Sequence, residues 1–235
     1  MKLYTYFRSS AAFRVRIALN LKGIAWEPVF VHLAKGEHRG AAYGEINPQG
    51  LVPALEDDGR LLTQSLAILE YLEETRPQPP LLPSDAAGRA RVRSLALLVA
   101  CEIHPLNNLR VLEYLRRALG QSEAQVNAWY CQTTGSLDGL ARLEAALARG
   151  GTGRFCHGDS PTIADCCLVP QVFNAQRPRR DTAPYPTVMR IFAECMRLEA
   201  FDRAQPARQP DGSNSAPRRP GPDAEIAERI PEDCR

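Results

Sequence analysis

The chain has 235 residues, which suits one large domain or two small ones, and 44% of them are apolar, which is enough for a sizeable core. A formal net charge of +2 gives no overall field that would draw the protein to nucleic acid or to a membrane surface. We find no run of 18 apolar residues and no apolar leader after Met1, so we expect a cytoplasmic protein with no membrane span.

In chain order, residues 1–75 alternate between strand signals and helix signals. We predict a strand at 3–7, a helix at 11–22 that stops at Gly23, a strand at 26–33, a short helix or irregular segment at 36–45, a hairpin of 51–55 and 60–63, and a helix at 66–74. The order β-α-β followed by β-β-α indicates a right-handed crossover and then an antiparallel hairpin with a covering helix. Residues 1–76 are therefore predicted to form a thioredoxin-like α/β domain.

Proline dominates residues 77–83, which we interpret as a stiff linker. The pattern from 84 to 205 is helical almost throughout and predicts an all-α domain. Ser84 is a candidate cap for a helix that reaches 119 with a break near Pro105, and the Ser122-x-x-Gln125 capping box opens a helix toward 148. Thr162-x-x-Asp165 resembles another such cap, and Pro186 can start a last helix that ends near 198.

The composition changes after residue 205, where proline, arginine, aspartate and glycine dominate. Such a segment buries too little apolar surface to offset its ordering entropy, so we expect residues 206–235 to be disordered. The seven cysteines form no C-x-x-C pair, and no histidine stands beside two of them at zinc-ligand spacing. We therefore expect reduced thiols and no metal site.

The candidate chemistry begins at Ser9-Ser10, between the first strand and the first helix. Strand carboxyl ends and helix N-termini meet at this position, where backbone N–H groups favour an anion. A serine hydroxyl could donate to a thiolate here, but it could equally be a simple helix cap. The residues alone favour the cap.

Two further positions have the same double interpretation. Pro53 is unusual in a paired strand, and a cis Val52-Pro53 bond would expose the Val52 backbone to a ligand, whereas a trans proline on an edge strand is the commoner case. Gln64-Ser65 stands at the start of the third helix, where it could hold a carboxylate or merely cap the helix. In a thioredoxin-like domain all of these positions line one face, so their conjunction is stronger than any one of them.

At these positions the sequence resembles the zeta class of the glutathione S-transferases, the family that includes maleylacetoacetate isomerases. The resemblance covers residues 1–208 and rests on several separated segments: Arg8-Ser9-Ser10-Ala11-Ala12-Phe13-Arg14-Val15-Arg16-Ile17-Ala18-Leu19, Asn47-Pro48 with Leu51-Val52-Pro53-Ala54-Leu55, Gln64-Ser65, His104 to Leu112, and Ala164 to Arg177. It implies the glutathione S-transferase fold, glutathione as the cofactor, and a homodimer.

The resemblance also implies a role for each matching position. Ser9, with Ser10 beside it, corresponds to the hydroxyl on the glutathione sulfur, and Val52 with Pro53 to the backbone that pairs with the cysteinyl part. The other implied glutathione contacts are Gln64 and Ser65 at the γ-glutamyl end, His38 at the glycine end, and His104, Asn108 and Arg110 on the helix that walls the substrate cleft. Arg8, Arg110 and Arg177 are implied to hold substrate carboxylates.

The implied reaction is glutathione-dependent cis–trans isomerisation of maleylacetoacetate to fumarylacetoacetate, a step of tyrosine and phenylalanine catabolism. Thiolate adds to the double bond, the bond rotates, and elimination gives the trans isomer. Ala11 replaces the family's motif cysteine, but the thiol of glutathione itself does the chemistry, so we expect isomerisation to survive. A more polar stretch after Arg177, Pro178-Arg179-Arg180, weakens the assignment of Arg177.

Three alternatives stay open. Maleylpyruvate is a sister substrate, although Gln176 stands where a second arginine would have favoured it. General conjugation or haloacid dechlorination by a glutathione transferase is another possibility, and a non-catalytic interaction module is the third. The arginines of the first helix, Arg14 and Arg16, are interpreted as structural pairs or dimer-surface charges.

Overall fold

A computed structural model describes residues 1–135, 139–176 and 182–213 of the chain. The chain divides into two compact units: the first is Met1–Pro83 together with the segment that begins at Met196, and the second extends over Ser84–Cys195. The first unit is therefore discontinuous in sequence. This differs from the expected boundaries, because residues 196–205 group with the first unit and not with the helical one.

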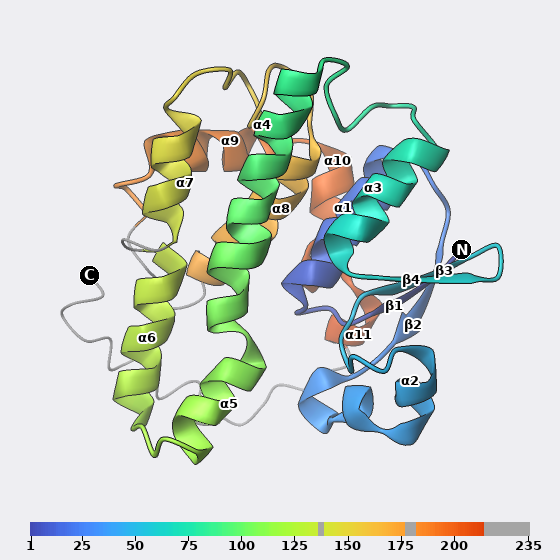
Figure 1. Ribbon diagram of the computed structural model, residues 1–235, viewed down its shortest axis with the longest axis vertical. Helices are drawn as coiled ribbons and strands as arrows, with labels where there is room; N and C mark the ends of the chain where they lie inside the picture. The colour runs from blue at the N-terminus through green and yellow to red at the C-terminus, as the bar shows by residue number, and fades with distance from the viewer. Residues whose placement is uncertain (136–138, 177–181, 214–235) are drawn as a thin grey trace. The chain divides into compact units, whose positions relative to one another are not determined.

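The first unit contains a four-stranded sheet with the strand order β2-β1-β3-β4 (Figure 1). β1 (Lys2–Thr5) pairs in parallel with β2 (Glu27–Phe30) and antiparallel with β3 (Ala54–Asp57), which continues into β4 (Arg60–Thr63). The strands are shorter than the sequence predicts, but their order and directions are those of the predicted thioredoxin-like domain.

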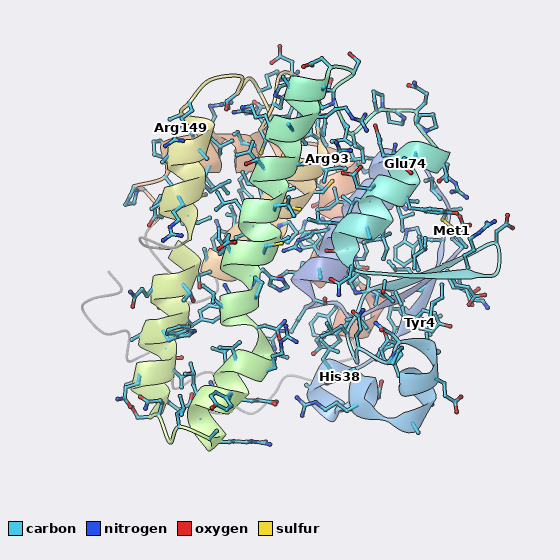
Figure 2. All side chains as sticks on the ribbon, in the orientation of Figure 1. Met1, Tyr4, His38, Glu74, Arg93 and Arg149 are labelled. Atoms are coloured by element: carbon cyan, nitrogen blue, oxygen red, sulfur yellow. The ribbon has the colours of Figure 1, made fainter. Side chains whose placement is uncertain are left out.

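Helices cover both faces of this sheet. α1 (Ser10–Leu21) forms the crossover from β1 to β2, and α3 (Ser65–Thr75) follows β4 and packs beside α1. Alternate residues of β1 point to opposite faces, so Leu3 is buried on the α1 side while Tyr4 reaches Tyr43 of α2 (Ala41–Ile46), with 6.0 Å between the ring centroids. Tyr4 and His38 are both labelled on the α2 side in Figure 2. His38 belongs to a short 3-10 segment, η2 (Glu37–Arg39), which follows η1 (Leu33–Lys35).

The chain after residue 198 is ordered up to the limit of the described residues. It forms α10 (Glu199–Ala204), which packs against α1, then η5 (Pro206–Arg208) and α11 (Pro210–Ser213). Disorder was therefore the wrong prediction for residues 206–213. Composition does not reveal that this segment meets the first turn of the chain, where the Asp211 carboxylate accepts the Phe7 N–H at 2.8 Å. Residues 214–235 lie outside the described residues.

The proline-rich segment at 77–83 is packed onto the first unit. Glu73 of α3 is 7% exposed and accepts the backbone N–H groups of Leu81 at 2.9 Å and Leu82 at 3.2 Å. The Lys22 ammonium donates to Glu73 at 2.8 Å and to the carbonyls of Arg76 and Pro79 at 2.7 and 3.0 Å. This segment is thus fastened along its length and is not a free linker.

The described part of the second unit consists of helices and connecting loops, and its β-structure is one isolated bridge between Thr152 and Gly158. Its elements are α4 (Ala86–Leu97), a π-helical segment η3 (Leu98–Ile103), η4 (His104–Asn107), α5 (Leu109–Arg117), α6 (Glu123–Gly135), α7 (Leu140–Leu147), α8 (Ile163–Gln176) and α9 (Pro186–Met196). α8 is buried over most of its length and packs against α4 (Figure 1). The predicted break near Pro105 is confirmed, since the helix changes to π and then to 3-10 geometry over η3 and η4.

The run Ala86–Arg117 meets the length and hydropathy criterion for a membrane-crossing helix, which we did not expect from the sequence. Core helices meet the same criterion, so the finding is weak evidence for a span. On this run Val92, Val99 and Ile103 are fully buried, while 33% of the qualifying window is buried in all.

Two of the predicted helix caps are confirmed. Ser122 and Gln125 exchange bonds at the start of α6, with Ser122 N donating to Gln125 at 2.9 Å and Gln125 N donating to the Ser122 Oγ at 3.3 Å. At α8 the Asp165 carboxylate accepts from both N and Oγ1 of Thr162. The expected cap of α4 was wrong by one residue, because Asp85 and not Ser84 accepts the Gly88 N–H.

Candidate functional site

The turn from β1 into α1 carries Arg8, Ser9 and Ser10. Ser9 is the N-cap of α1, and its Oγ accepts the Ala12 N–H at 3.2 Å. The capping interpretation therefore describes what the hydroxyl oxygen does, while the hydroxyl proton remains able to donate to a ligand. Ser9 is half-buried, Ser10 is buried and Arg8 is exposed.

The N-terminus of α1 is electrostatically open. Its first turn contains no acidic side chain, so α1 itself supplies no carboxylate to neutralise its free N–H groups and the positive end of the helix dipole. A thiolate placed near Ser9 would meet a hydroxyl donor and this dipole together, and both would lower its pKa.

The Val52-Pro53 bond is cis, so the rarer of the two geometries considered from the sequence is the one present. The Tyr43 hydroxyl and the Asn47 amide both donate to the Leu51 carbonyl at 2.7 Å, and so they fix Leu51, the residue that precedes Val52. Sheet pairing starts only at Ala54, and we find no hydrogen bond of the Val52 N–H or C=O within the described residues. Val52 therefore offers one backbone donor and one backbone acceptor to an extended ligand.

The N-terminus of α3 is the next open position. Gln64 has a left-handed backbone with φ 67°, makes no side-chain cap, and donates its amide to Gln49 at 2.7 Å. Ser65 is 6% exposed, and its Oγ accepts a hydrogen bond from the Arg14 guanidinium at 3.2 Å. As in α1, the first turn of α3 holds no acidic residue.

The sheet register brings these segments to one edge. Ala54 pairs with Tyr4 on one side and with Thr63 on the other. The turn that follows β1, the segment that precedes β3 and the helix that follows β4 therefore all leave the sheet at the same end. Tyr6 and Val52 share one apolar cluster there, in agreement with the register. The structure thus brings Ser9, Val52 and Ser65 together, as the sequence predicts.

His38 lies beside the same edge through the loop before β3. A side chain at Gly50, whose φ is 62°, would place its Cβ 3.1 Å from the His38 carbonyl oxygen, so only glycine fits this approach comfortably. The main chain of η2 is therefore pressed against the loop that leads to Val52.

The remaining predicted residues belong to the second unit. His104 starts η4, Asn108 caps α5 by accepting the Arg110 N–H at 3.2 Å, and Arg110 is exposed. Arg177 lies outside the described residues. Within the second unit, Asn108 already uses its side-chain oxygen as a helix cap.

Sequence reasoning missed the part played by Arg14. It is 2% exposed and donates to Ser65, so of its two interpretations the structural pair agrees with the structure and the dimer-surface charge does not, but the partner was not foreseen. A signal was available, because Arg14 lies among the apolar residues of α1, next to Phe13 and Val15, where a solvated charge would be out of place. Gln49, the partner of Gln64, had no such signal.

A four-stranded thioredoxin-like sheet with an open serine-capped helix, joined in sequence to a helical unit, defines a glutathione S-transferase. Residues 8–75 match the family model for the glutathione S-transferase N-terminal domain, and residues 110–194 match the model for the C-terminal domain. The chain belongs to the zeta class of this family, together with the maleylacetoacetate and maleylpyruvate isomerases.

Its relatives match over nearly their whole length. A maleylpyruvate isomerase of a Ralstonia species is 53% identical, covering 91% of this chain and 100% of the relative, and a maleylacetoacetate isomerase of Rhizobium meliloti is 50% identical, covering 88% and 96%. A holo structure of a bacterial zeta-class maleylpyruvate isomerase superposes with a TM-score of 0.86 at 52% identity, covering 90% of this chain and 99% of that one. A maleylacetoacetate isomerase of Methylobacterium extorquens, solved with bound malonate and glutathione, gives 0.86 at 50% identity, covering 89% and 98%.

Proposed function

We propose that this protein is a glutathione-dependent cis–trans isomerase of maleyl diketo acids. The observation that carries the proposal is the edge of the sheet at which an open α1 N-terminus, a Val52 backbone that no described residue pairs, and an open α3 N-terminus meet. Relatives at about half identity that carry this activity in their names support it.

Each part of this edge suits one part of glutathione. The N–H groups of α3, with Gln64 and Ser65, suit the γ-glutamyl carboxylate, and the buried Arg14 behind Ser65 adds positive charge. The Val52 N–H and C=O suit the cysteinyl backbone, and His38 is our candidate for the glycine end, which the resemblance to the family supports. With the tripeptide laid across these groups, its sulfur would be at Ser9.

When bound, glutathione supplies the thiolate that adds to the cis double bond and leaves again after the bond has rotated. The protein's own part is to keep that sulfur ionised and the substrate aligned. Ser9 donates its hydroxyl proton toward the sulfur position, and the α1 dipole favours negative charge there. Donors preset toward developing charge are worth about 10²-fold or more in rate each.

The substrate carries carboxylates at both ends, which must be held while its middle rotates. Arg8 is exposed directly before Ser9 and can pair bidentately with one of them. Arg110 and Arg177 are our candidates for the other carboxylate, and the resemblance to the family is what supports them.

We favour maleylacetoacetate as the substrate, and a specific observation supports maleylpyruvate as the second candidate. The Ralstonia maleylpyruvate isomerase is 53% identical over its full length, against 50% for the Rhizobium maleylacetoacetate isomerase. The two substrates share the maleyl double bond and the diketo group and differ only in the chain beyond it.

The test is ultraviolet monitoring of both substrates, with and without glutathione. We expect turnover of maleyl substrate only when glutathione is present, and a higher kcat/KM for maleylacetoacetate. A higher kcat/KM for maleylpyruvate would reassign the substrate. Turnover of neither, in a protein that binds immobilised glutathione, would leave a general glutathione transferase. Failure to bind glutathione would instead indicate a non-catalytic module.

Homodimerisation and a cytoplasmic location remain proposals based on the resemblance to the family. Light scattering behind a sizing column measures the first directly. A mass close to twice the chain's 26.0 kDa supports a dimer.

A further inference from the structure

The backbone N–H and C=O of Phe7 are held by an acidic residue 204 positions away and by a basic residue 9 positions away. Its N–H donates to Asp211 Oδ2 at 2.8 Å, and its carbonyl accepts from Arg16 Nη2 at 3.2 Å. Phe7 directly precedes Arg8 and is two residues before Ser9, so this grip acts on the turn that carries the proposed sulfur and carboxylate contacts.

Arg16 is the internal half of this grip. It is fully buried in α1, and beyond Phe7 it donates to Thr5 Oγ1 at 3.0 Å, to the Tyr6 carbonyl at 3.3 Å and to the Ala204 carbonyl of α10 at 3.0 Å. The guanidinium therefore ties the end of β1 to the C-terminal segment. Burial lowers the pKa of Arg16 to about 9, and the Asp211 carboxylate opposes that shift, so the group is cationic at neutral pH.

Asp211 is the external half of the grip, supplied from α11. Its Oδ1 is buried and has no hydrogen-bond donor within the described residues, and its negative charge attracts the Arg16 guanidinium. The neighbouring Gly212 fits closely, since a Cβ there would lie 2.9 Å from the Pro206 carbonyl oxygen and 3.1 Å from the Phe7 ring. α11 is thus pressed against the turn and not merely near it.

We propose that Asp211 is a positioning residue for the glutathione site: with Arg16 it clamps the Phe7 peptide and so fixes where Arg8 and Ser9 present their side chains. The proposal rests on the proposed glutathione function of Ser9. It assigns a role in that site to the C-terminal segment, which the sequence alone had suggested to be disordered. The proposal assigns Asp211 no direct contact with glutathione or substrate.

The test compares Asp211→Ala and Asp211→Asn with Glu199→Gln in the full-length protein. Alanine removes both the acceptor and the charge, whereas asparagine keeps an oxygen for the Phe7 N–H. Glu199→Gln is the matched control: it also removes one negative charge from the C-terminal segment, but Glu199 is 82% exposed and pairs only with Arg203 within the described residues, at 3.6 Å.

Two readouts separate positioning from plain folding. One is the pKa of the thiol of bound glutathione, followed by ultraviolet thiolate absorbance against pH. The other is peptide-resolved hydrogen exchange of the amides in residues 5–9. For Asp211→Ala we expect exchange about tenfold faster there and about tenfold less thiolate at neutral pH, with smaller changes for asparagine and none for Glu199→Gln.

Unchanged exchange and thiol pKa in a folded Asp211→Ala protein would overturn the proposal. Loss of the fold in both Asp211 variants would overturn it as well, because Asp211 would then be a residue of general stability. If the wild-type protein does not bind glutathione, the proposed function fails, and Asp211 has no site to position whatever the exchange data show.

Discussion

The N-termini of α1 and α8 each follow a hydroxyl residue, Ser9 or Thr162, but they have opposite roles. At α8, Asp165 supplies the negative charge from within the chain: it is fully buried and accepts from Thr162 N, Thr162 Oγ1 and Cys156 N at 2.7–2.9 Å. At α1, a neutral serine makes one bond at 3.2 Å and no acid is present in the first turn. We call a helix N-terminus closed when a carboxylate of the same chain neutralises it. We call it open when its cap is neutral, because it can then bind the anionic group of a ligand.

The α3 N-terminus agrees with this comparison. It has no side-chain cap and no acid, and its serine faces a buried arginine. Four substitutions test whether the difference between open and closed N-termini determines function.

The largest effect is expected from Asp165→Ala. It leaves two buried backbone N–H groups and one hydroxyl without an acceptor, which should lower the free energy of unfolding by about 3 kcal/mol. Urea unfolding measures this, with glutathione affinity of the folded fraction unchanged. A loss below about 1 kcal/mol would mean that α8 does not depend on its internal carboxylate.

Ser9→Ala should have almost the opposite profile. We expect kcat/KM for the maleyl substrate to fall about 10²-fold because a charge-stabilising donor is lost. The loss of the cap itself should cost only about 1 kcal/mol in stability. Ser122→Ala, which removes the exposed cap of α6, is the matched control, with a similar stability loss and unaltered turnover. Full activity in Ser9→Ala would refute the thiolate role.

Ser65→Ala tests the second open N-terminus. The hydroxyl should contribute one hydrogen bond to a carboxylate, so we expect the KM for glutathione to rise about tenfold with kcat little changed. Thr75→Ala removes a hydroxyl from the other end of the same helix, where it donates to the Tyr71 carbonyl, and should leave the KM alone. Equal effects of the two variants would show that Ser65 acts through helix stability.

The smallest effect is a pH dependence at the closed N-terminus. Burial raises the pKa of Asp165 above its ordinary value of 3.8, although hydrogen bonds from Cys156 and Thr162 act in the other direction. The folded state therefore binds this proton more tightly than the unfolded chain, so the contribution of Asp165 to stability falls as pH rises from that ordinary value. The unfolding free energy of Asp165→Asn should decline less steeply above pH 4 than that of the wild type, as measured by urea titration at several pH values. Parallel curves would contradict this assignment.

Local patterns carried most of the fold prediction. The alternation around Tyr4, the Asp57-Asp58-Gly59 turn and the capping boxes depend on neighbours in sequence, and they correctly indicated the sheet and the helices. They also indicated that Ser9, Val52 and Ser65 would share an edge, because strand order decides this.

Contacts between distant parts of the chain could not be predicted in this way. Arg14 lies 51 residues from its partner Ser65, and Arg16 lies 188 residues from its partner Ala204. Periodicity could therefore indicate only that a charge lay among apolar residues. The ordered segment at 206–213 was missed for the same reason. Polar composition argues for disorder unless a specific acceptor such as Asp211 finds a buried donor elsewhere.

The hydrogen bonds of Lys22 and Glu73 to residues 76–82 determine where a chimaera of two related proteins can be joined. Consider a chimaera in which residues 1–76 come from one relative and the rest of the chain from another. Glu73 would then come from one parent, and Leu81 and Leu82, whose N–H groups donate to it, would come from the other. The buried Glu73 carboxylate would have to bind the backbone of a different protein. A junction at Ser84 keeps the whole set of contacts on one parent. Because the same unit is completed from Met196 on, a faithful exchange needs a second junction there, so that both ends of the polypeptide come from one source.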